Sequence, residues 1–179
     1  DHFIGYAKYY RIPNDGSSAS DGEWIKAPGE KLFQVLNDSI NDFNVFTEDL
    51  GDVTEDVIKL REQFCFPGMH VLQFDFKNED LDKERSPNSV LCTGTHDNDT
   101  LIGWFNSLPS NANDKSILAQ DKLLKFFKCG IDEIHWKIID YAFSSSSNIV
   151  IIPMQDICGE DSIARFNTPG TLSSNNWSW

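Results

Sequence analysis

Strand-like and helix-like segments alternate along this chain, and the alternation constrains the fold more than any other feature of the sequence. The strand-like segments are rich in β-branched and aromatic residues and span 44–51, 69–76, 89–99 and 148–153. Helical patterns separate most of them. Strands that alternate with helices are typical of a parallel sheet, because parallel neighbours need a crossover connection. The chain is therefore predicted to be an α/β protein.

The helical segments are predicted from apolar spacing and from end signals. They cover 28–38, 54–64, 99–108, 113–129 and 132–143. Thr54 and the acids that follow it have the pattern of an N-cap and first turn. An apolar face follows in this helix, at Val57, Ile58, Leu60 and Phe64. The polar segment 14–22 is predicted to be an exposed loop, and 148–153 a buried parallel strand.

Polar clusters follow three of the strand-like runs directly. These clusters are EDLG at 48–51, THDND at 95–99 and MQD at 154–156. In a (β/α) barrel the ends of the strands form the catalytic face. Only about four strands fit this sequence, whereas a closed barrel has about eight. The pattern therefore predicts either part of a barrel or another α/β fold.

The charge balance limits the kinds of partner. The chain has 15 basic and 28 acidic residues, a formal net charge of −13. This excess of acid argues against nucleic acid and against anionic membrane surfaces, which need clustered Lys and Arg. It is compatible with a neutral ligand such as a sugar. No apolar run approaches the roughly 20 residues of a membrane span.

Cysteine usage and the first residue bear on compartment and completeness. Four cysteines occur without CxxC spacing, which favours free thiols in a reducing compartment such as the cytoplasm. The chain begins at Asp1, without a methionine or a signal peptide. It is therefore expected to be cut from a longer protein.

Three acid-bearing segments are candidates for chemistry: Asp1 in DHF, Glu48 in EDLG and Asp97 in THDND. They are far apart in sequence, so only a closed sheet would bring them together. Paired carboxylates of opposite protonation state suit glycoside chemistry, in which one attacks the anomeric carbon and the other protonates the leaving oxygen.

Each acid also has another interpretation. Glu48 and Asp49 could place negative charge at the N-terminus of the following helix. Asp97 and Asp99 could cap the helix that begins near Asp99. His96 with Asp97 could bind a divalent cation, which would indicate a metal-dependent phosphohydrolase. Asp1 taken alone is uninformative.

Aromatic residues are similarly ambiguous. Phe74 and Phe76 lie two apart in a predicted strand and so on one face of it, where core packing is the default expectation. Trp104, Trp177 and Trp179 could stack on sugar rings, but scattered tryptophans are more often core or surface residues. Patterning alone therefore reaches an α/β protein with acids at strand ends.

Seven ordered sequence blocks extend this interpretation. They are DHFIGYAKYYRIP, WIKAPGEKLF, EDLGDVTEDVIKLR, FPGMHVLQFDF, CTGTHDNDTLIGW, IIPMQDICG and ARFNTPGT with NWSW. In this order they resemble the amylomaltases, or disproportionating enzymes, of glycoside hydrolase family 77. The resemblance covers nearly the whole chain, and THDNDT together with FPGMxVLQF is highly specific.

The resemblance implies a fold and an activity. The fold is the C-terminal part of a (β/α)8 TIM barrel, about strands 4–8 with their helices, in which residues 1–179 form one portion and the N-terminal half lies upstream. The activity is that of a 4-α-glucanotransferase, with α-1,4-glucans or maltooligosaccharides as donor and acceptor and with no metal or organic cofactor. A cytoplasmic location is implied, or a plastid if a transit peptide precedes the chain.

The resemblance also implies individual roles. Asp1 matches the nucleophile, Glu48 the general acid/base and Asp97 the third acid, which holds sugar hydroxyls. His96 resembles the histidine that contacts the sugar at the cleavage site, and Phe74 an aromatic on the acceptor side. Cys92 stands where the family commonly has tyrosine. The alternative is a non-catalytic glucan-binding or structural fragment, because half a barrel leaves strand edges open.

Overall fold

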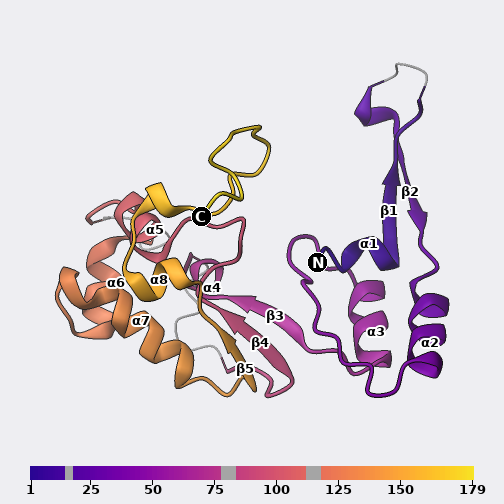
Figure 1. The fold of residues 1–179 in the computed structure, drawn as a ribbon, viewed down its shortest axis with the longest axis horizontal. Helices are drawn as coiled ribbons and strands as arrows, with labels where there is room; N and C mark the ends of the chain where they lie inside the picture. The colour runs from indigo at the N-terminus through magenta and orange to yellow at the C-terminus, as the bar shows by residue number, and fades with distance from the viewer. Residues whose placement is uncertain (15–17, 78–83, 112–117) are drawn as a thin grey trace. The chain divides into compact units, whose positions relative to one another are not determined.

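The computed structural model describes residues 1–14, 18–77, 84–111 and 118–179. The chain divides into two compact units, unit 1 (Asp1–Met69) and unit 2 (His70–Trp179) (Figure 1). Each unit has its own hydrophobic core, and each is described by itself.

Unit 1 contains a β-hairpin that the sequence did not predict. After the short helix α1 (Ile4–Ala7), strands β1 (Lys8–Arg11) and β2 (Glu23–Lys26) pair antiparallel. Figure 1 shows the hairpin extending away from the helices of the unit. The described residues of the predicted loop 14–22 are exposed or partly exposed, as expected. Within that loop, Ser18 caps the single turn η1 (Ala19–Asp21).

Two predicted helices form the rest of unit 1. Helix α2 (Gly29–Ser39) and helix α3 (Glu55–Gln63) confirm the segments 28–38 and 54–64. Thr54 is the N-cap of α3, but its hydroxyl donates to Asp56 Oδ1 (2.5 Å) and does not accept from the helix backbone. The core of the unit gathers apolar residues of α1, α2, α3 and the segment after α3: Phe3, Ile4, Ala7, Phe33, Val57, Leu60 and Phe66.

The predicted strand within 44–51 is wrong. The structure has neither helix nor strand at 44–50. Thr47 is held there by two hydrogen bonds instead, because its amide N (2.9 Å) and its hydroxyl (3.0 Å) both donate to the carbonyl of Pro67. Thr47 is only 2% exposed, whereas the apolar Phe46 beside it is 48% exposed, so polar contacts and not an apolar face bury this segment.

Unit 2 contains most of a three-stranded sheet. Its strands are β3 (Gly68–Val71, which begins at the end of unit 1), β4 (Ser89–Cys92) and β5 (Ile149–Ile151), in the order β3-β4-β5. β4 and β5 are parallel, with Val90 opposite Ile149 and Cys92 opposite Ile151. The predicted α/β class with a parallel sheet is therefore confirmed.

The prediction of one strand over 69–76 is wrong in its second half. The strand ends at Val71 and helix α4 (Leu72–Lys77) begins at once. Leu72 and Phe76, four residues apart on one helix face, are both fully buried, whereas Phe74 is 44% exposed. Phe74 and Phe76 therefore do not share a face, and only Phe76 is a core residue.

The remaining helices are α5 (Leu101–Ser107), α6 (Gln120–Phe127), α7 (Ile134–Phe143, preceded by η2, Ile131–Glu133), α8 (Met154–Cys158) and η3 (Ser162–Ala164). Of these, α5, α6 and α7 follow the predicted order, whereas α8 and η3 were not predicted. Part of the predicted helix 113–129 falls on 113–117, which lie outside the described residues. Helices α5, α6 and α7 gather on one side of the strands (Figure 1) and share a core with Leu72, Phe76 and Leu91.

The last strand is less buried than predicted. Ile149 and Ile151 are each 40% exposed, whereas every residue of β4 is buried. The difference follows from position, because β4 has a described neighbour on both sides and β5 ends the sheet. None of the described helices is both long enough and apolar enough to cross a membrane.

Candidate functional site

Glu48 lies beside the start of the chain. Its carboxylate accepts a hydrogen bond from the amide N of His2 (2.7 Å), and its carbonyl accepts one from the amide N of Phe3 (2.8 Å). His2 is the residue after Asp1, so the Glu48 carboxylate is bonded to the chain one residue from Asp1, within unit 1. His2 reaches this position with a left-handed backbone (φ 52°), which few non-glycine residues adopt.

Asp49 fixes this segment from the inside. Its side chain is buried, accepts from the amide N of Met69 (2.8 Å) and pairs with the guanidinium of Arg61 (2.5 Å). A Cβ on Gly68 would collide with that guanidinium, which explains the glycine of the FPGM block. Asp49 is therefore a buried tether, and the acids in the first turn of α3 are Glu55 and Asp56. The idea that Glu48 and Asp49 decorate that helix end is wrong.

Asp97 lies in the loop that follows β4, as predicted. Its carboxylate accepts from the side-chain amide of Asn167 (2.6 Å), and its carbonyl accepts from the guanidinium of Arg165 (2.8 Å). The side chain remains 51% exposed. The loop is thus held by residues some 70 positions later (separations of 68 and 70) while its carboxylate still faces solvent.

His96 has a defined environment in the same loop. Its Nε2 lies 3.5 Å from Asp97 Oδ1, and its ring centroid lies 5.2 Å from that of Trp177. Trp177 is in turn held against Phe166 by an edge-on ring contact (4.8 Å) and by a hydrogen bond from its amide N to the Phe166 carbonyl (2.8 Å). Trp177 therefore supports the imidazole as part of the 96–97 cluster.

Asp99 has a structural role next to the loop. Its carboxylate accepts from the amide N of Thr100 (2.8 Å) and from the hydroxyl of Ser162 (2.7 Å). The N-cap of α5 is Thr100, whose hydroxyl accepts from the amide N of Gly103 (3.0 Å). The prediction that Asp97 or Asp99 caps this helix is therefore wrong. The N-cap is Thr100, the residue after Asp99, and Asp97 takes no part in the cap.

Helix α4 contacts the loop through Gln73. The side-chain amide of Gln73 donates to the Asp99 carbonyl (2.9 Å). Phe74 follows Gln73 in α4 and is exposed to solvent. It therefore lies one residue from the side chain that contacts the loop. The predicted substrate-binding aromatic is thus presented to solvent from α4 and is not packed in the core.

Asp156, from the MQD cluster, ties the loop to the helix that follows. It is 2% exposed and accepts from the hydroxyl of Thr93 (2.5 Å) and from the amide N of Leu101 (2.7 Å). Burial raises the pKa of its carboxyl, and the two hydrogen bonds act in the opposite direction. One side chain after β5 therefore joins the end of β4 to the start of α5.

The five predicted site residues fall into two groups. In unit 1, Glu48 is bonded to the residue that follows Asp1; in unit 2, His96 and Asp97 are adjacent, with Phe74 one residue from a contact to their loop. Sequence reasoning missed the contacts of the supporting residues, which are Arg61, Asp156, Arg165, Asn167 and Trp177. All five fall within the seven sequence blocks, but only Asp156, in the MQD cluster, and Trp177, as a possible sugar-stacking ring, had a further signal.

Other candidates have structural explanations. Among the described residues, no three His, Cys, Asp or Glu side chains are grouped so that they could hold a metal ion. Trp104 packs on the core residue Phe76 (6.1 Å between rings), and Trp179 is 52% exposed. Cys92 is buried in β4, and burial raises the pKa of its thiol to about 11. A neutral thiol at this place adds packing and no charge.

Comparison with known proteins identifies the family of the chain. The family model described as 4-alpha-glucanotransferase, of glycoside hydrolase family 77, matches residues 1–179. Over the whole chain, identity is 40% with the chloroplastic/amyloplastic 4-alpha-glucanotransferase of Arabidopsis thaliana. It is 40% with the 4-alpha-glucanotransferase of Synechocystis sp. and 36% with that of Thermus thermophilus. The chain spans 31%, 35% and 37% of these relatives.

Solved structures give the same result. The amylomaltase of Streptococcus agalactiae in complex with acarbose matches the whole chain with a TM-score of 0.84 and 28% identity, over 36% of its own length. The amylomaltase of Corynebacterium glutamicum shares the fold at a TM-score of 0.67 and 16% identity, over 98% of this chain and 30% of its own. With a family model that matches every residue, the chain belongs to glycoside hydrolase family 77, the 4-alpha-glucanotransferase family.

Proposed function

We propose that the intact protein is a 4-α-glucanotransferase that moves α-1,4-glucan segments between maltooligosaccharides with retention of configuration. The observation that supports this proposal is the hydrogen bond between the Glu48 carboxylate and the amide of His2, the residue that follows Asp1, in a chain of this family. Retaining enzymes need two carboxyl groups about 5–5.5 Å apart, so that one attacks the sugar directly.

In the first half of the reaction, the carboxylate of Asp1 attacks the anomeric carbon of the donor. The glycosidic C–O bond breaks as the new C–O bond to Asp1 forms. Glu48, protonated at this stage, gives its proton to the leaving 4-oxygen. The products are a glucosyl ester on Asp1 and a shortened sugar.

In the second half, the 4-hydroxyl of an acceptor sugar attacks the same carbon. It gives its proton to Glu48, which now acts as a base, and the bond to Asp1 breaks. Transfer competes successfully with hydrolysis when a sugar hydroxyl, and not water, reaches the ester. The two displacements together retain the α configuration.

The loop residues Asp97 and His96 are proposed to hold sugar hydroxyls. The exposed carboxylate of Asp97 accepts hydrogen bonds, and its direction is set by Asn167 (2.6 Å). The imidazole of His96 offers a further hydrogen bond and is supported by Trp177. Phe74 is proposed to stack on an acceptor sugar, which its 44% exposure permits.

For the fold, we propose that residues 1–179 are the C-terminal portion of a (β/α)8 barrel. Support comes from the parallel strands β4 and β5, the helices between them and the candidate acid after β4. The likeness to the Streptococcus agalactiae amylomaltase also supports it. A cytoplasmic or plastid location is proposed from the reducing compartment that thiols such as the buried Cys92 favour.

The decisive experiment is to incubate the intact protein with maltotriose and separate the products. Disproportionation gives glucose together with longer maltooligosaccharides. Glu48→Gln removes the acid/base proton and is expected to lower the rate about 10²–10⁴-fold. Glu62→Gln, at an exposed glutamate of α3, is the matched control and should react at the wild-type rate.

Three results would contradict the proposal. Production of glucose and maltose alone would indicate a hydrolase. Binding of maltotriose with no reaction would favour the alternative, a glucan-binding protein without catalysis. A rate that is unchanged in Glu48→Gln would remove Glu48 from the mechanism.

A further inference from the structure

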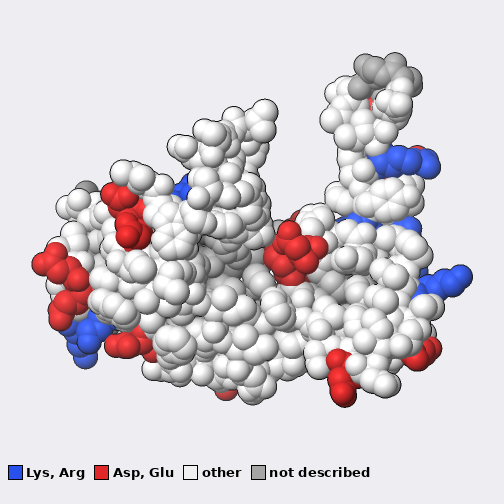
Figure 2. Space-filling model, viewed as in Figure 1, with Lys and Arg blue, Asp and Glu red and all other residues white. Residues whose placement is uncertain are grey.

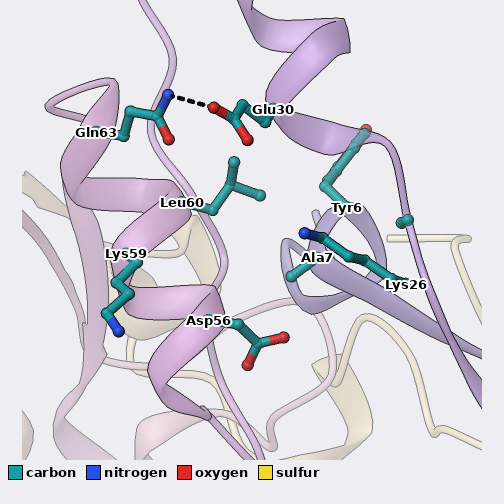
Figure 3. Close-up of a pocket in the computed structure, with 9 residues that line it drawn as sticks. Tyr6, Ala7, Lys26, Glu30, Asp56, Lys59, Leu60 and Gln63 are labelled. Carbon is teal, nitrogen blue, oxygen red and sulfur yellow. Dashed lines mark hydrogen bonds between the residues drawn. The ribbon is translucent and has the colours of Figure 1, made fainter.

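A pocket of about 250 Å³ lies in unit 1 between α1, the end of β2 and the helices α2 and α3 (Figure 3). It is below the roughly 300–1,000 Å³ of pockets that enclose drug-sized ligands, and it suits a ligand of about one sugar ring. None of its lining residues is Asp1 or Glu48. The pocket is therefore separate from the candidate acids of the same unit.

The lining combines an apolar base with polar groups of both signs. Leu60 and Ala7 are buried at its base, and the exposed ring of Tyr6 borders it. At one end Gln63 donates to Glu30 (3.0 Å), which links α3 to α2. Figure 3 shows the side chain of Lys26 extending across the opening toward α3, Asp56 lying below it, and Lys59 pointing away.

An aromatic surface adjoins the pocket on the hairpin. Strand residues two apart share a face, so Trp24 and Lys26 lie on the same side of β2. Tyr10 lies opposite Trp24, with ring centroids 5.2 Å apart. Trp24 is 59% exposed and Tyr10 39%, so both rings are open to a ligand. On the face drawn in Figure 2, basic side chains lie along this hairpin.

Lys8 links the two features. Its amino group lies 5.0 Å from the centre of the Trp24 ring. It also acts on Asp56 in the pocket: the hydrogen bond from Thr54 is the main cause that holds the pKa of Asp56 below its usual range, and the charge of Lys8 adds to it. Lys8 and Lys26 therefore connect the aromatic pair to the pocket as one surface.

The chemistry of this surface selects among ligands. Within the pocket lining, Lys26 and Lys59 are matched by Glu30 and Asp56, although the chain as a whole carries −13. The hairpin adds one cation, Lys8, beside the Trp24 ring. A neutral polyhydroxyl ligand uses donors and acceptors equally, whereas an anion would meet two carboxylates. Exposed aromatic rings beside such groups present flat apolar faces to the C–H faces of sugars.

We propose that the pocket and the Tyr10–Trp24 pair form a second α-glucan-binding surface, which holds a glucan away from the reacting acids. One sugar occupies the pocket beside Tyr6, and the chain continues over the Trp24 ring. The ligand class rests on the proposed glucanotransferase function, but binding here requires no catalysis. Its consequence is retention of the enzyme on long glucans.

The test is electrophoresis of the intact folded protein in gels that contain amylopectin. Wild type should be retarded, and Trp24→Ala should bind about three- to tenfold more weakly, as expected for the loss of one aromatic contact. Trp24→Phe, which keeps a ring, should restore most of the retardation. Trp136→Ala removes a tryptophan of similar exposure (49%) on α7 and should migrate as wild type does. Dextran in place of amylopectin should retard no variant.

Lys26→Met gives a second route to the same surface, because it removes a hydrogen-bond donor and keeps the length of the side chain. It should also weaken binding to amylopectin. Retardation that is unchanged in both Trp24→Ala and Lys26→Met would overturn the proposal, and so would an equal loss in Trp136→Ala. Failure of maltotriose disproportionation with Trp24-dependent retardation intact would count against the transferase function alone.

Discussion

Two buried aspartates hold the two candidate acid segments, and they do so with different chemistry. Asp49, next to Glu48, pairs with the Arg61 cation and accepts one amide. Asp156, beneath the loop of Asp97, accepts from a hydroxyl and an amide, both of them neutral donors. In both places a candidate acid, Glu48 or Asp97, lies in a segment that is held by a buried aspartate.

The difference predicts how each segment fails. The Glu48 segment has no helix or strand of its own, so an ion pair and a few backbone contacts hold it. The Asp97 loop follows a fully buried strand, and the buried carboxylate beneath it, Asp156, is bonded by neutral donors. Removal of a charge should therefore disturb unit 1 most, whereas a change of pH should act on unit 2 through Asp156.

The largest effect is expected for Arg61→Met. It leaves the buried carboxylate of Asp49 without its cation, and the loss of one partner of a buried pair costs about 3–5 kcal/mol. The Arg61 side chain is 26% exposed, so water offsets part of this and about 2–3 kcal/mol is expected. Urea denaturation of the intact protein measures the change.

Lys59→Met on the same helix is the control for Arg61. Lys59 pairs with Glu55 at the surface (2.7 Å), with both side chains largely exposed. Its loss should change the free energy of unfolding by less than about 0.5 kcal/mol. Equal effects of the two variants would contradict the role given to the Asp49–Arg61 pair.

A somewhat smaller loss is expected for Asp156→Ala. The change leaves the Thr93 hydroxyl and the Leu101 amide without their acceptor in a buried place. Each of these two groups costs about 1–3 kcal/mol when it loses its partner. Removal of a carboxyl whose charged form is disfavoured by burial offsets part of this cost, so the net loss should stay below that of Arg61→Met. Thermal unfolding should show a lower midpoint, and hydrogen exchange should be faster at the start of α5. Unchanged exchange at Leu101 would argue against the tether.

Asp156→Asn tests the pH dependence. Burial raises the folded-state pKa of Asp156 above the roughly 3.9 of an unfolded aspartate. The folded state then binds the proton more tightly than the unfolded state does. Stability from the protonated form is therefore present below about pH 4 and is lost as the pH rises through the folded-state pKa.

The amide that Asp156→Asn introduces cannot ionise, so the variant should lose less stability than wild type between about pH 4 and neutrality. Urea midpoints at several pH values measure the two slopes, and other titrating groups cancel because both proteins share them. Parallel slopes would show that Asp156 does not titrate in this range.

The smallest effect is expected for Asn167→Ala. Asn167 donates to the Asp97 carboxylate (2.6 Å) in a largely exposed place, so its loss misdirects an acid and removes no reacting group. The transfer rate on maltotriose should fall about three- to tenfold, with less than about 0.5 kcal/mol lost in stability. Asn106→Ala, at an exposed asparagine of α5, is the control.

Local patterns predict most of the helices and the parallel sheet. Helix α3 is readable from Thr54 and from the buried spacing of Val57 and Leu60. Helix α4 is missed because Leu72 and Phe76 fit a strand pattern as well as a helix turn, and only their common burial in one core decides between the two. The hairpin is missed because its strands are largely exposed and have no clear alternation.

The candidate acids are visible in the sequence, but their supports are not. Asp97 stands out in THDND, whereas Asn167 touches it across 70 residues of chain. Asp49 is closer in the sequence to Thr54 than to Arg61. Local reasoning therefore predicts a place at the N-terminus of the helix and not the pair with Arg61. Contacts of this kind depend on tertiary packing, which no local spacing encodes.

The most direct measurement is to trap the intermediate on the intact protein. A fluorinated α-glucosyl fluoride keeps the first displacement fast through its good leaving group, and the ring fluorine slows the second step, whose transition state is oxocarbenium-like. Digestion and mass spectrometry then locate the bound sugar. We expect one fluorinated glucosyl residue, joined to Asp1. An adduct on Glu48 or Asp97, or rapid turnover with inverted configuration and no adduct, would contradict it.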